Sequence, residues 1–254
     1  MNVTEKAPLD TAHLTAADQW ILSRFQDATR AISSNMEEGE FGLAADRIYD
    51  FAWSEFCDWY IELAKSRLNG DDPAAKKAVQ GVLLYVLEGL LKLLHPFMPF
   101  ITEEIWQAIP HEGEALIVAA WPKYREDLCF QAEEDGMESI MQAIRAVRNR
   151  RAEMNVPPAR RTTLYIVTEK QDLFSAGIPF ITRLAYASEV EVGSQAPQDL
   201  NGMVTVSTHD ATMYLPLAEL VDIEKELERI QKELTKAREN LELSLIHISE
   251  PTRH

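Results

Sequence analysis

The residue types that usually carry catalysis are present in this chain, but their spacing does not support a reaction. There is no glycine-rich phosphate loop, no His/Cys cluster with metal-ligand spacing and no convincing Ser/His/Asp set. Adjacent carboxylates at Glu103 and Glu104 would point about 100° apart on a helix. His209 and Asp210 fall where a hairpin turn is expected, and turns favour such residues. We therefore expect no catalytic residue, no metal site and no bound cofactor in these 254 residues.

The aromatic stretch from Phe51 to Lys65 carries residues that are suited to binding a ligand. Asp58, Glu62 and Lys65 share the solvated face of the predicted helix, and Ile61 points with them. An apolar group beside hydrogen-bonding groups is suited to holding an unstacked nucleobase. The opposite stripe, typical of a buried face, consists of Tyr49, Ala52, Trp53, Phe56, Trp59, Tyr60 and Leu63.

Two apolar residues, Phe51 and Ile61, fall outside that stripe. Either a neighbouring segment covers them, or they belong to an exposed contact surface. Glu62 also has an ordinary interpretation, as a surface carboxylate paired with Lys65 or Ser66. The residue types alone leave these alternatives open.

A basic cluster follows later, with six arginines between Arg145 and Arg161. Arg145, Arg148 and Arg151 are spaced by three residues, so they share one side of a predicted helix. Arginines in this arrangement can position a nucleic-acid backbone without distinguishing its sequence. They could equally pair with the carboxylates of this acidic chain.

Composition limits the class of protein. A hydrophobic fraction of 46% and a charged fraction of 26% are typical of a soluble protein with a sizeable core. The net charge of −16 argues against general nucleic-acid binding, although a local patch can still bind a specific RNA. No membrane-spanning run and no secretory leader is evident, and Cys57 and Cys129 are expected to be reduced thiols. We expect a cytoplasmic protein that does not enter a membrane.

Three longer motifs resemble the anticodon-binding domain of bacterial valine–tRNA ligase, a class I aminoacyl-tRNA synthetase. Trp-Ser-Glu-Phe-Cys-Asp-Trp-Tyr-Ile-Glu (53–62) is similar to the hallmark helix of that domain. His-Pro-Phe-Met-Pro-Phe-Ile-Thr-Glu-Glu-Ile-Trp (95–106) is similar to its next landmark. Ile-Arg-Ala-Val-Arg-Asn-Arg-Arg-Ala-Glu-Met-Asn-Val-Pro-Pro (144–158) resembles the valine enzyme more than its relatives for isoleucine, leucine and methionine. The resemblance runs from about residue 10 to about residue 242.

This resemblance implies a part in recognising tRNA(Val). The parent enzyme is expected to be a monomer that joins valine to its tRNA, with ATP and Mg²⁺ bound in a catalytic domain. The nucleotide-binding signatures and the editing domain of the family do not occur in this chain, so we expect a C-terminal part of the enzyme that is inactive alone.

The resemblance also implies particular tRNA contacts. The family's anticodon contacts include an Ile/Leu–Glu pair, which corresponds to Ile61 and Glu62, and we place Asp58 and Lys65 beside them. Arg145, Arg148 and Arg151 are expected to contact the tRNA backbone. An arginine and a stacking phenylalanine of the family would precede Met1.

The predicted fold is mainly α. Helices are expected over about 15–34, 41–68, 73–94, 100–109 and 133–155, forming an anticodon-binding bundle over residues 1–156. A small α+β module is expected over 157–219, with strands near 162–167, 189–192, 203–208 and 212–217, and a helix near 174–186.

The last part of the chain carries a heptad pattern. Apolar residues from Leu220 to Leu241 alternate steps of three and four, which predicts a single coiled-coil helix over 220–242. A lone seam of this kind is expected to self-associate weakly. The last residues, 243–254, depart from the pattern and resemble the translation of a common sequencing-library adapter, so we interpret them as a non-native tail.

An alternative function belongs to another class. The chain could be a helical protein-interaction module that dimerises through the Leu220–Leu241 seam. RNA binding and its dependence on salt would separate the two hypotheses.

Overall fold

A computed structural model describes residues 8–220, 234–237 and 241 of the chain. They form two compact units, divided between Glu138 and Ser139. This division falls inside helix α6 (Gln131–Glu153). The domain boundary near residue 156 stays a prediction from the sequence. The two units are described separately.

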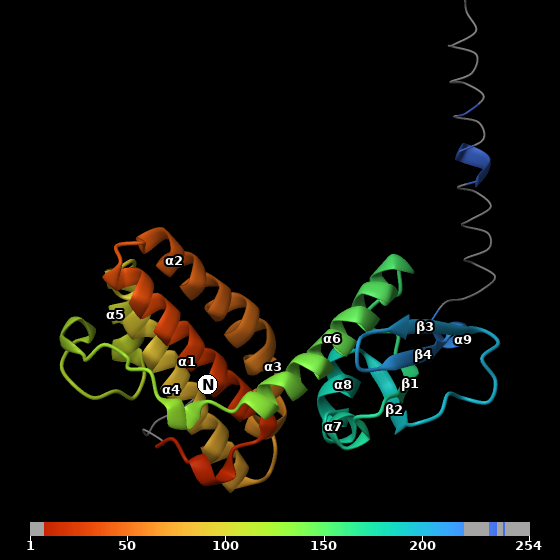
Figure 1. Ribbon diagram of the computed structural model, residues 1–254, viewed down its shortest axis with the longest axis horizontal. Helices are drawn as coiled ribbons and strands as arrows, with labels where there is room; N and C mark the ends of the chain where they lie inside the picture. The colour runs from red at the N-terminus through yellow and green to blue at the C-terminus, as the bar shows by residue number, and fades with distance from the viewer. Residues whose placement is uncertain (1–7, 221–233, 238–240, 242–254) are drawn as a thin grey trace, which may run out of the picture. The chain divides into compact units, whose positions relative to one another are not determined.

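The first unit is a bundle of helices (Figure 1). Its α-helices are α1 (Ala16–Glu37), α2 (Phe41–Asp50), α3 (Ile61–Leu68), α4 (Pro73–Leu94) and α5 (Pro99–Ala108), and α6 begins at its end. A π-helical segment, η2 (Phe51–Tyr60), joins α2 to α3. Short 3-10 turns are η1 (Thr11–His13), η3 (Leu116–Val118) and η4 (Glu126–Leu128).

Local sequence signals explain where the helices begin. Thr15 and Asp18 form a reciprocal capping box at the start of α1, as their spacing predicts. Asp72 accepts a hydrogen bond from the Ala74 amide, and Pro73 occupies the first turn of α4. Pro99 likewise occupies the first turn of α5. These signals lie within a few residues, and they were therefore visible in the sequence.

The centre of the bundle packs α1 against η2 and α4. Phe25 lies 5.6 Å from Phe51 and 5.8 Å from Tyr85, measured between ring centroids. Gly89 of α4 faces the same ring: a Cβ atom there would lie only 2.2 Å from Phe25 Cζ. α1 and α4 can therefore approach this closely only because residue 89 has no side chain.

We expect Gly89→Ala to destabilise the bundle. Alanine gains about 1 kcal/mol of helix propensity over glycine, but overpacking a filled core costs roughly 1–3 kcal/mol or more. Because Phe25 is itself enclosed, the second effect should prevail, and the midpoint of urea unfolding should fall. Gly42→Ala is the matched control, since a Cβ at Gly42 meets no atom within 4 Å. An increase in stability for Gly89→Ala would contradict this account.

The second unit is the predicted α+β module together with most of α6. Its sheet has the order β2-β1-β4-β3. Strands β1 (Thr162–Val167) and β2 (Ala187–Gly193) are parallel, whereas β4 (Thr212–Pro216) is antiparallel to both β1 and β3 (Met203–Ser207). Helices α7 (Gln171–Ala176) and α8 (Ile178–Leu184) connect β1 to β2, and α9 (Leu217–Leu220) follows β4.

One helix of this unit differs from the prediction. The helix expected near 174–186 is two short helices, which meet at Gly177. A Cβ on Gly177 would approach Ile140 Cδ1 to 2.8 Å, so the α7–α8 junction lies directly against α6. This packing explains why α6 from Ser139 onward belongs to the second unit.

The structure confirms a mainly α fold with a small four-stranded α+β module. The predicted coiled-coil seam and the tail lie almost wholly outside the described residues, so both stay predictions from sequence. None of the described helices combines the length and the apolar character that a membrane span requires.

Candidate functional site

The four residues predicted to form a recognition face lie along η2 and α3. Asp58 is exposed, while Ile61, Glu62 and Lys65 are partly exposed. Their spacing places them on successive turns of one continuous helix. The structure therefore brings these residues together on an accessible surface of the first unit.

The direction of the Glu62 side chain depends on the π-helical segment η2. In an unbroken α-helix of about 3.6 residues per turn, Glu62 would follow the buried Ala44 by about five full turns and point into the core. Within η2 the hydrogen bonds instead span five residues, as where the Ile61 amide donates to the Phe56 carbonyl. These wider turns contain more residues than α-helical turns, so the residues after them are rotated about the helix axis, and Glu62 faces outward. A π-helical insertion of this kind often marks a functional site.

The observed buried face differs in part from the predicted stripe. Phe56, Trp59, Tyr60 and Leu63 are buried as expected, and Ala52 is partly buried. Tyr49 and Trp53 are instead 62% and 55% exposed. Phe51, expected on the polar side, is fully buried against Phe25, so a neighbouring segment covers it. The prediction failed because it assumed one α-helical period throughout.

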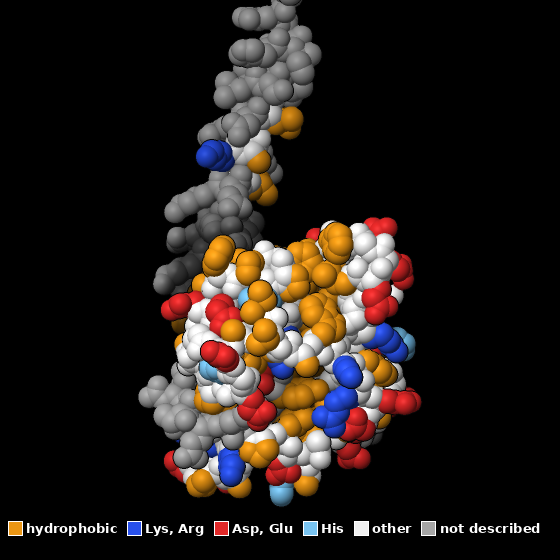
Figure 2. Space-filling view, turned by 90° about the vertical axis from the view of Figure 1, so that its left-hand side faces the viewer, with side chains coloured by type: hydrophobic (Ala, Val, Ile, Leu, Met, Phe, Trp, Pro, Cys, Tyr) orange, Lys and Arg blue, Asp and Glu red, His pale blue; other side chains and the backbone are white. Residues whose placement is uncertain are grey.

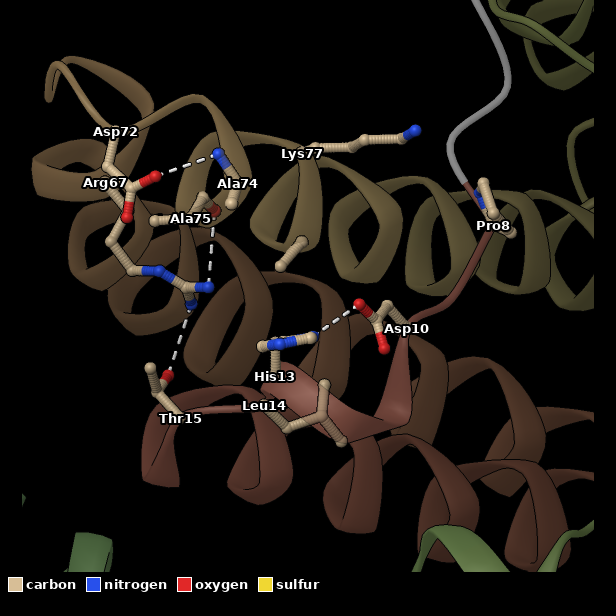
Figure 3. A pocket seen from close by; sticks show the side chains of 11 residues that line it. Pro8, Asp10, His13, Leu14, Thr15, Arg67, Asp72, Ala74, Ala75 and Lys77 are labelled. Carbon is tan, nitrogen blue, oxygen red and sulfur yellow. Dashed lines mark hydrogen bonds and ion pairs between the residues drawn. The ribbon is translucent and has the colours of Figure 1, made fainter.

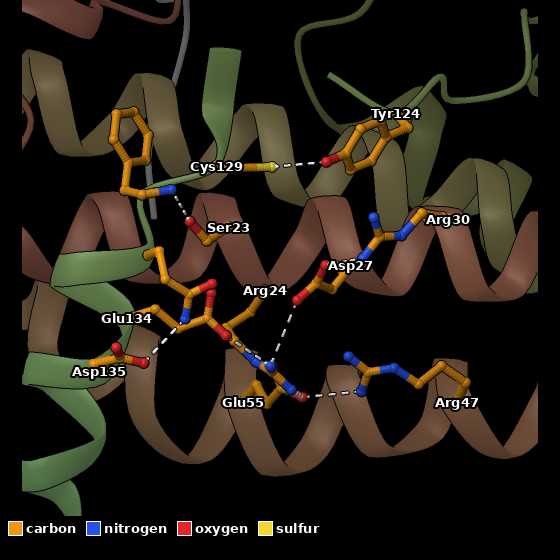
Figure 4. Close-up of polar contacts among 12 residues, drawn as sticks. Ser23, Arg24, Asp27, Arg30, Arg47, Glu55, Tyr124, Cys129, Glu134 and Asp135 are labelled. Carbon is orange, nitrogen blue, oxygen red and sulfur yellow. Dashed lines mark hydrogen bonds and ion pairs between the residues drawn. The ribbon is translucent and has the colours of Figure 1, made fainter. Parts of the chain in front are cut away.

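An ion-pair network holds the helix upstream of the recognition face (Figure 4). Arg24 of α1 donates to both carboxylate oxygens of Glu55, over 2.8 and 3.1 Å, and to Glu134 over 2.9 Å. Arg47 pairs with the same Glu55 carboxylate at 2.9 Å. The hydrogen bonds to Glu55, the largest cause, raise the pKa of Arg24 further above its ordinary value. Bidentate geometry and partial burial make this contact stronger than an isolated surface pair.

A buried carboxylate holds the helix on both sides of Ile61 and Glu62, at Tyr60 and at Arg67. Asp18 is 1% exposed. It accepts a hydrogen bond from the Tyr60 hydroxyl at 2.6 Å and a short one from the Arg67 guanidinium. Burial, followed by the neighbouring Asp18 charge, raises the pKa of Tyr60 well above its ordinary value. Ile61 and Glu62 therefore lie between two anchored positions, which limits their freedom before any ligand binds.

Glu62 has a partner in the structure, because the Lys65 ammonium donates to its carboxylate. Both side chains remain partly exposed. An exposed pair of this type contributes only ~0–1 kcal/mol, so Lys65 does not hold the Glu62 carboxylate strongly.

A cavity of about 590 Å³ lies where η1, the end of α3 and the start of α4 meet (Figure 3). His13 contacts Asp10 at 2.7 Å, and Arg67 reaches the Ala75 carbonyl at 3.3 Å. Lys77 extends from α4 beyond these groups. Since several of the charged lining groups already have partners, we assign no ligand to this cavity.

The arginines of α6 do not share one environment. Arg145 and Arg148 are exposed, but Arg151 is 3% exposed. Arg151 donates to the Pro157 and Arg160 carbonyls and lies 5.6 Å from the Tyr186 ring centre, while Arg148 lies 5.9 Å from the same centre. Burial lowers the pKa of Arg151. Arg151 thus holds the chain after α6, and of the three predicted arginines Arg145 and Arg148 are the accessible ones.

Other polar residues have structural explanations. Asp210 lies in the β3–β4 turn, accepts a hydrogen bond from Ser139 at 2.6 Å and pairs with Lys170 at 2.9 Å. Across the described part of the chain, no group of three or more His, Cys, Asp or Glu residues could hold a metal ion. Sequence analysis missed the Arg24–Glu55 and Asp18–Arg67 pairs, because their members lie 31 and 49 residues apart.

A family model described as the anticodon-binding domain of tRNA ligase matches residues 18–168, more than half of the chain. This chain belongs to that family. The matched region of the anticodon-binding domain contains η2, α3 and all of α6.

Individual relatives agree with the family match. The chain is 47% identical to valine–tRNA ligase of Clostridium perfringens over 229 residues, which is 89% of this chain and 26% of the relative. It is 44% identical to valine–tRNA ligase of Geobacillus stearothermophilus over 225 residues, which is 87% of this chain and 26% of the relative. The chain thus spans about a quarter of the length of the relatives that it matches, and the predicted resemblance is confirmed.

Proposed function

We propose that this anticodon-binding domain recognises the anticodon of valine tRNA through Ile61 and Glu62. The observation that carries the proposal is an outward-facing apolar–carboxylate pair, held between two anchored positions within the family match. Ile61 supplies apolar contact to a displaced base, and Glu62 accepts hydrogen bonds from its edge. Asp58 and Lys65 flank the pair, and Lys65 is free to approach a phosphate once a base replaces it.

Arg145 and Arg148 are proposed to contact the tRNA backbone. Their guanidinium groups suit phosphate oxygens, and such contacts add affinity without sequence preference. Arg151 is left out because its side chain is buried and holds carbonyl groups of its own unit. The chain's net charge of −16 makes these local cations more important, since the rest of the surface repels RNA on average.

We expect Arg148→Ala to weaken binding of all tRNAs alike. Loss of one phosphate contact should reduce the slope of log affinity against log salt by about 0.7–0.9. The measurement is fluorescence titration of labelled tRNA at several salt concentrations. Arg150→Ala is the matched control on the same helix, because Arg150 pairs with Glu153 at 3.1 Å. An unchanged slope, or a loss confined to valine tRNA, would refute the phosphate assignment.

We further propose that a full-length ligase containing this chain attaches valine to tRNA(Val), with ATP and Mg²⁺ bound outside the matched region. We also propose that such a ligase is a monomer and is cytoplasmic. Weak self-association through the Leu220–Leu241 seam also stays a prediction. The rival function, a protein-interaction module, is not favoured by the family match.

The proposed function is tested by anticodon preference. The domain is titrated with valine tRNA and with the same tRNA carrying an altered anticodon. If the face around Glu62 contacts a base, the altered anticodon should lose about 1.4 kcal/mol or more of binding free energy, which corresponds to at least tenfold weaker binding. Equal affinity for both would rule out anticodon recognition by this domain.

A further inference from the structure

Two large aromatic side chains are exposed on the helix that carries Ile61 and Glu62. Tyr49 of α2 is 62% exposed, and Trp53 of η2 is 55% exposed. Their ring centroids lie 6.5 Å apart and the ring planes are tilted by 54°, so the two rings do not cover each other face to face. Neighbouring aromatic groups that are this exposed are typical of a binding surface.

The π-helical turns of η2 bring these two aromatic residues into line with Glu62. Residues of an α-helix recur on one side every three or four positions, and the wider turns of a π-helix lengthen that interval. Along this helix one series with steps of four, five and four residues is at least partly exposed, and we name it the η2 stripe: Tyr49, Trp53, Asp58 and Glu62. The step of five lies within η2, so the four side chains follow one another along a single side of the helix.

Charge determines which part of an RNA can lie on the η2 stripe. From residue 41 to residue 65 the sequence has five carboxylates, at positions 46, 50, 55, 58 and 62, and two cations, Arg47 and Lys65. Both cations pair with carboxylates of the same helix. Such a surface repels phosphates, whereas the uncharged faces of bases stack on exposed aromatic rings. An RNA that binds here must therefore turn its bases toward the stripe.

The length of the η2 stripe matches a single RNA loop. Nine residues separate Trp53 from Glu62, which corresponds to a rise of at most about 14 Å along a helix. Because stacked nucleotides follow one another at about 3.4 Å, a base on Trp53 would lie roughly four nucleotides from a base at Glu62. The family match to the anticodon-binding domain of tRNA ligase, over residues 18–168, includes the whole stripe. That match favours a tRNA loop over a protein as the occupant.

We propose that Tyr49 and Trp53 stack on bases of the tRNA anticodon loop, in the same loop as the base that Glu62 contacts. Stacking tolerates every base, so the two aromatic rings add affinity without selectivity, and the selectivity comes from Glu62. This inference rests on the proposed function in its choice of tRNA as the ligand. It adds to that function a second contact that does not depend on the identity of the base.

The fluorescence of Trp53 tests stacking directly. Among the five tryptophans, three are buried, namely Trp20, Trp59 and Trp106, and Trp121 is 36% exposed. The variant Trp121→Phe therefore keeps Trp53 as its exposed tryptophan. Adding the isolated anticodon stem–loop of valine tRNA should quench the Trp53 emission until the protein is saturated, and Trp53→Phe should remove this quenching. The same RNA annealed to a complementary strand should not quench, because its bases are then stacked inside a duplex.

Affinities separate stacking from anticodon reading. Trp53→Ala should weaken binding of valine tRNA and of the anticodon-altered tRNA alike, by about fivefold or more, so the preference between the two tRNAs should stay. Trp53→Phe keeps an aromatic face and should retain most of the affinity. Figure 2 views the molecule from the α5 side of Figure 1 and shows other hydrophobic side chains gathered on that face. Phe100 of α5 is 89% exposed, so Phe100→Ala is the matched control and should leave both affinities unchanged.

Stacking and anticodon recognition fail by different results. A clear preference for the valine anticodon without quenching of Trp53, or with unchanged affinity of Trp53→Ala, would overturn stacking alone. Equal affinity for both tRNAs together with quenching by the stem–loop would support stacking and overturn the assignment of Glu62. Quenching that grows with protein concentration in the absence of RNA would indicate a second copy on the stripe, and equal quenching by the duplex would indicate a phosphate contact. Either of these two results would overturn the proposal.

Discussion

Asp18→Ala should be the most destabilising single change in the first unit. The substitution removes the carboxylate that the Arg67 guanidinium and the buried Tyr60 hydroxyl share, and it removes the capping box with Thr15. Breaking one side of a buried ion pair costs about 3–5 kcal/mol, and loss of a helix cap adds roughly 1 kcal/mol. This is a large fraction of the ~5–15 kcal/mol that stabilises a typical domain. The measurement is chemical unfolding followed by circular dichroism.

Asp27→Ala, on the same helix, is a control for the loss of a carboxylate that is not buried. Asp27 contacts Arg24 and Arg30 but is partly exposed. Asp27→Ala should therefore cost less than about 1 kcal/mol, as for other exposed ion pairs. Similar losses for Asp18→Ala and Asp27→Ala would mean that the Asp18 network does not anchor the helix that bears Ile61 and Glu62.

Ile61→Ala and Glu62→Ala should each weaken binding of valine tRNA by about tenfold or more. Loss of apolar contact to a base costs about 1–3 kcal/mol, and loss of a charged acceptor costs roughly 1.5–3 kcal/mol, where 1.4 kcal/mol is a factor of ten. Glu62→Ala should also abolish the preference for the valine anticodon. Affinities of each variant for valine tRNA and for the anticodon-altered tRNA give both quantities.

Two controls show whether these variants act on binding alone: the stability of Glu62→Ala, and a carboxylate removed elsewhere on the bundle. Glu62 is on the surface, so Glu62→Ala should change the free energy of unfolding by less than about 0.5 kcal/mol. Glu104→Ala removes an exposed carboxylate from α5, at the other end of the bundle, and should leave the anticodon preference unchanged. If Glu104→Ala weakens binding as much as Glu62→Ala, a general charge effect explains the loss.

Features fixed by neighbouring residues could be predicted from the sequence. The Thr15–Asp18 capping box, the Pro73 helix start and the alternation that predicts β1 each depend on a few adjacent residues. The outward direction of Glu62 was also predicted, although from a helical register that proved wrong for Tyr49, Phe51 and Trp53.

Features that depend on distant partners could not be predicted. Phe51 packs against Phe25, and the Tyr60 hydroxyl donates to Asp18, and a periodic pattern contains neither contact. Arg151 is spaced like Arg145 and Arg148, but the reversal of the chain after α6 and the Tyr186 ring enclose it. The division inside α6 likewise follows from the packing of Ile140 against Gly177.

Transplanting the anticodon loop tests whether Ile61 and Glu62 contact the anticodon. A tRNA for another amino acid is given the valine anticodon loop, and its affinity for the domain is compared with that of the unaltered tRNA. If Ile61 and Glu62 contact the anticodon, the transplant should gain at least about tenfold in affinity, and Glu62→Ala should remove that gain. A transplant that binds no better than its parent tRNA would contradict anticodon recognition by this domain.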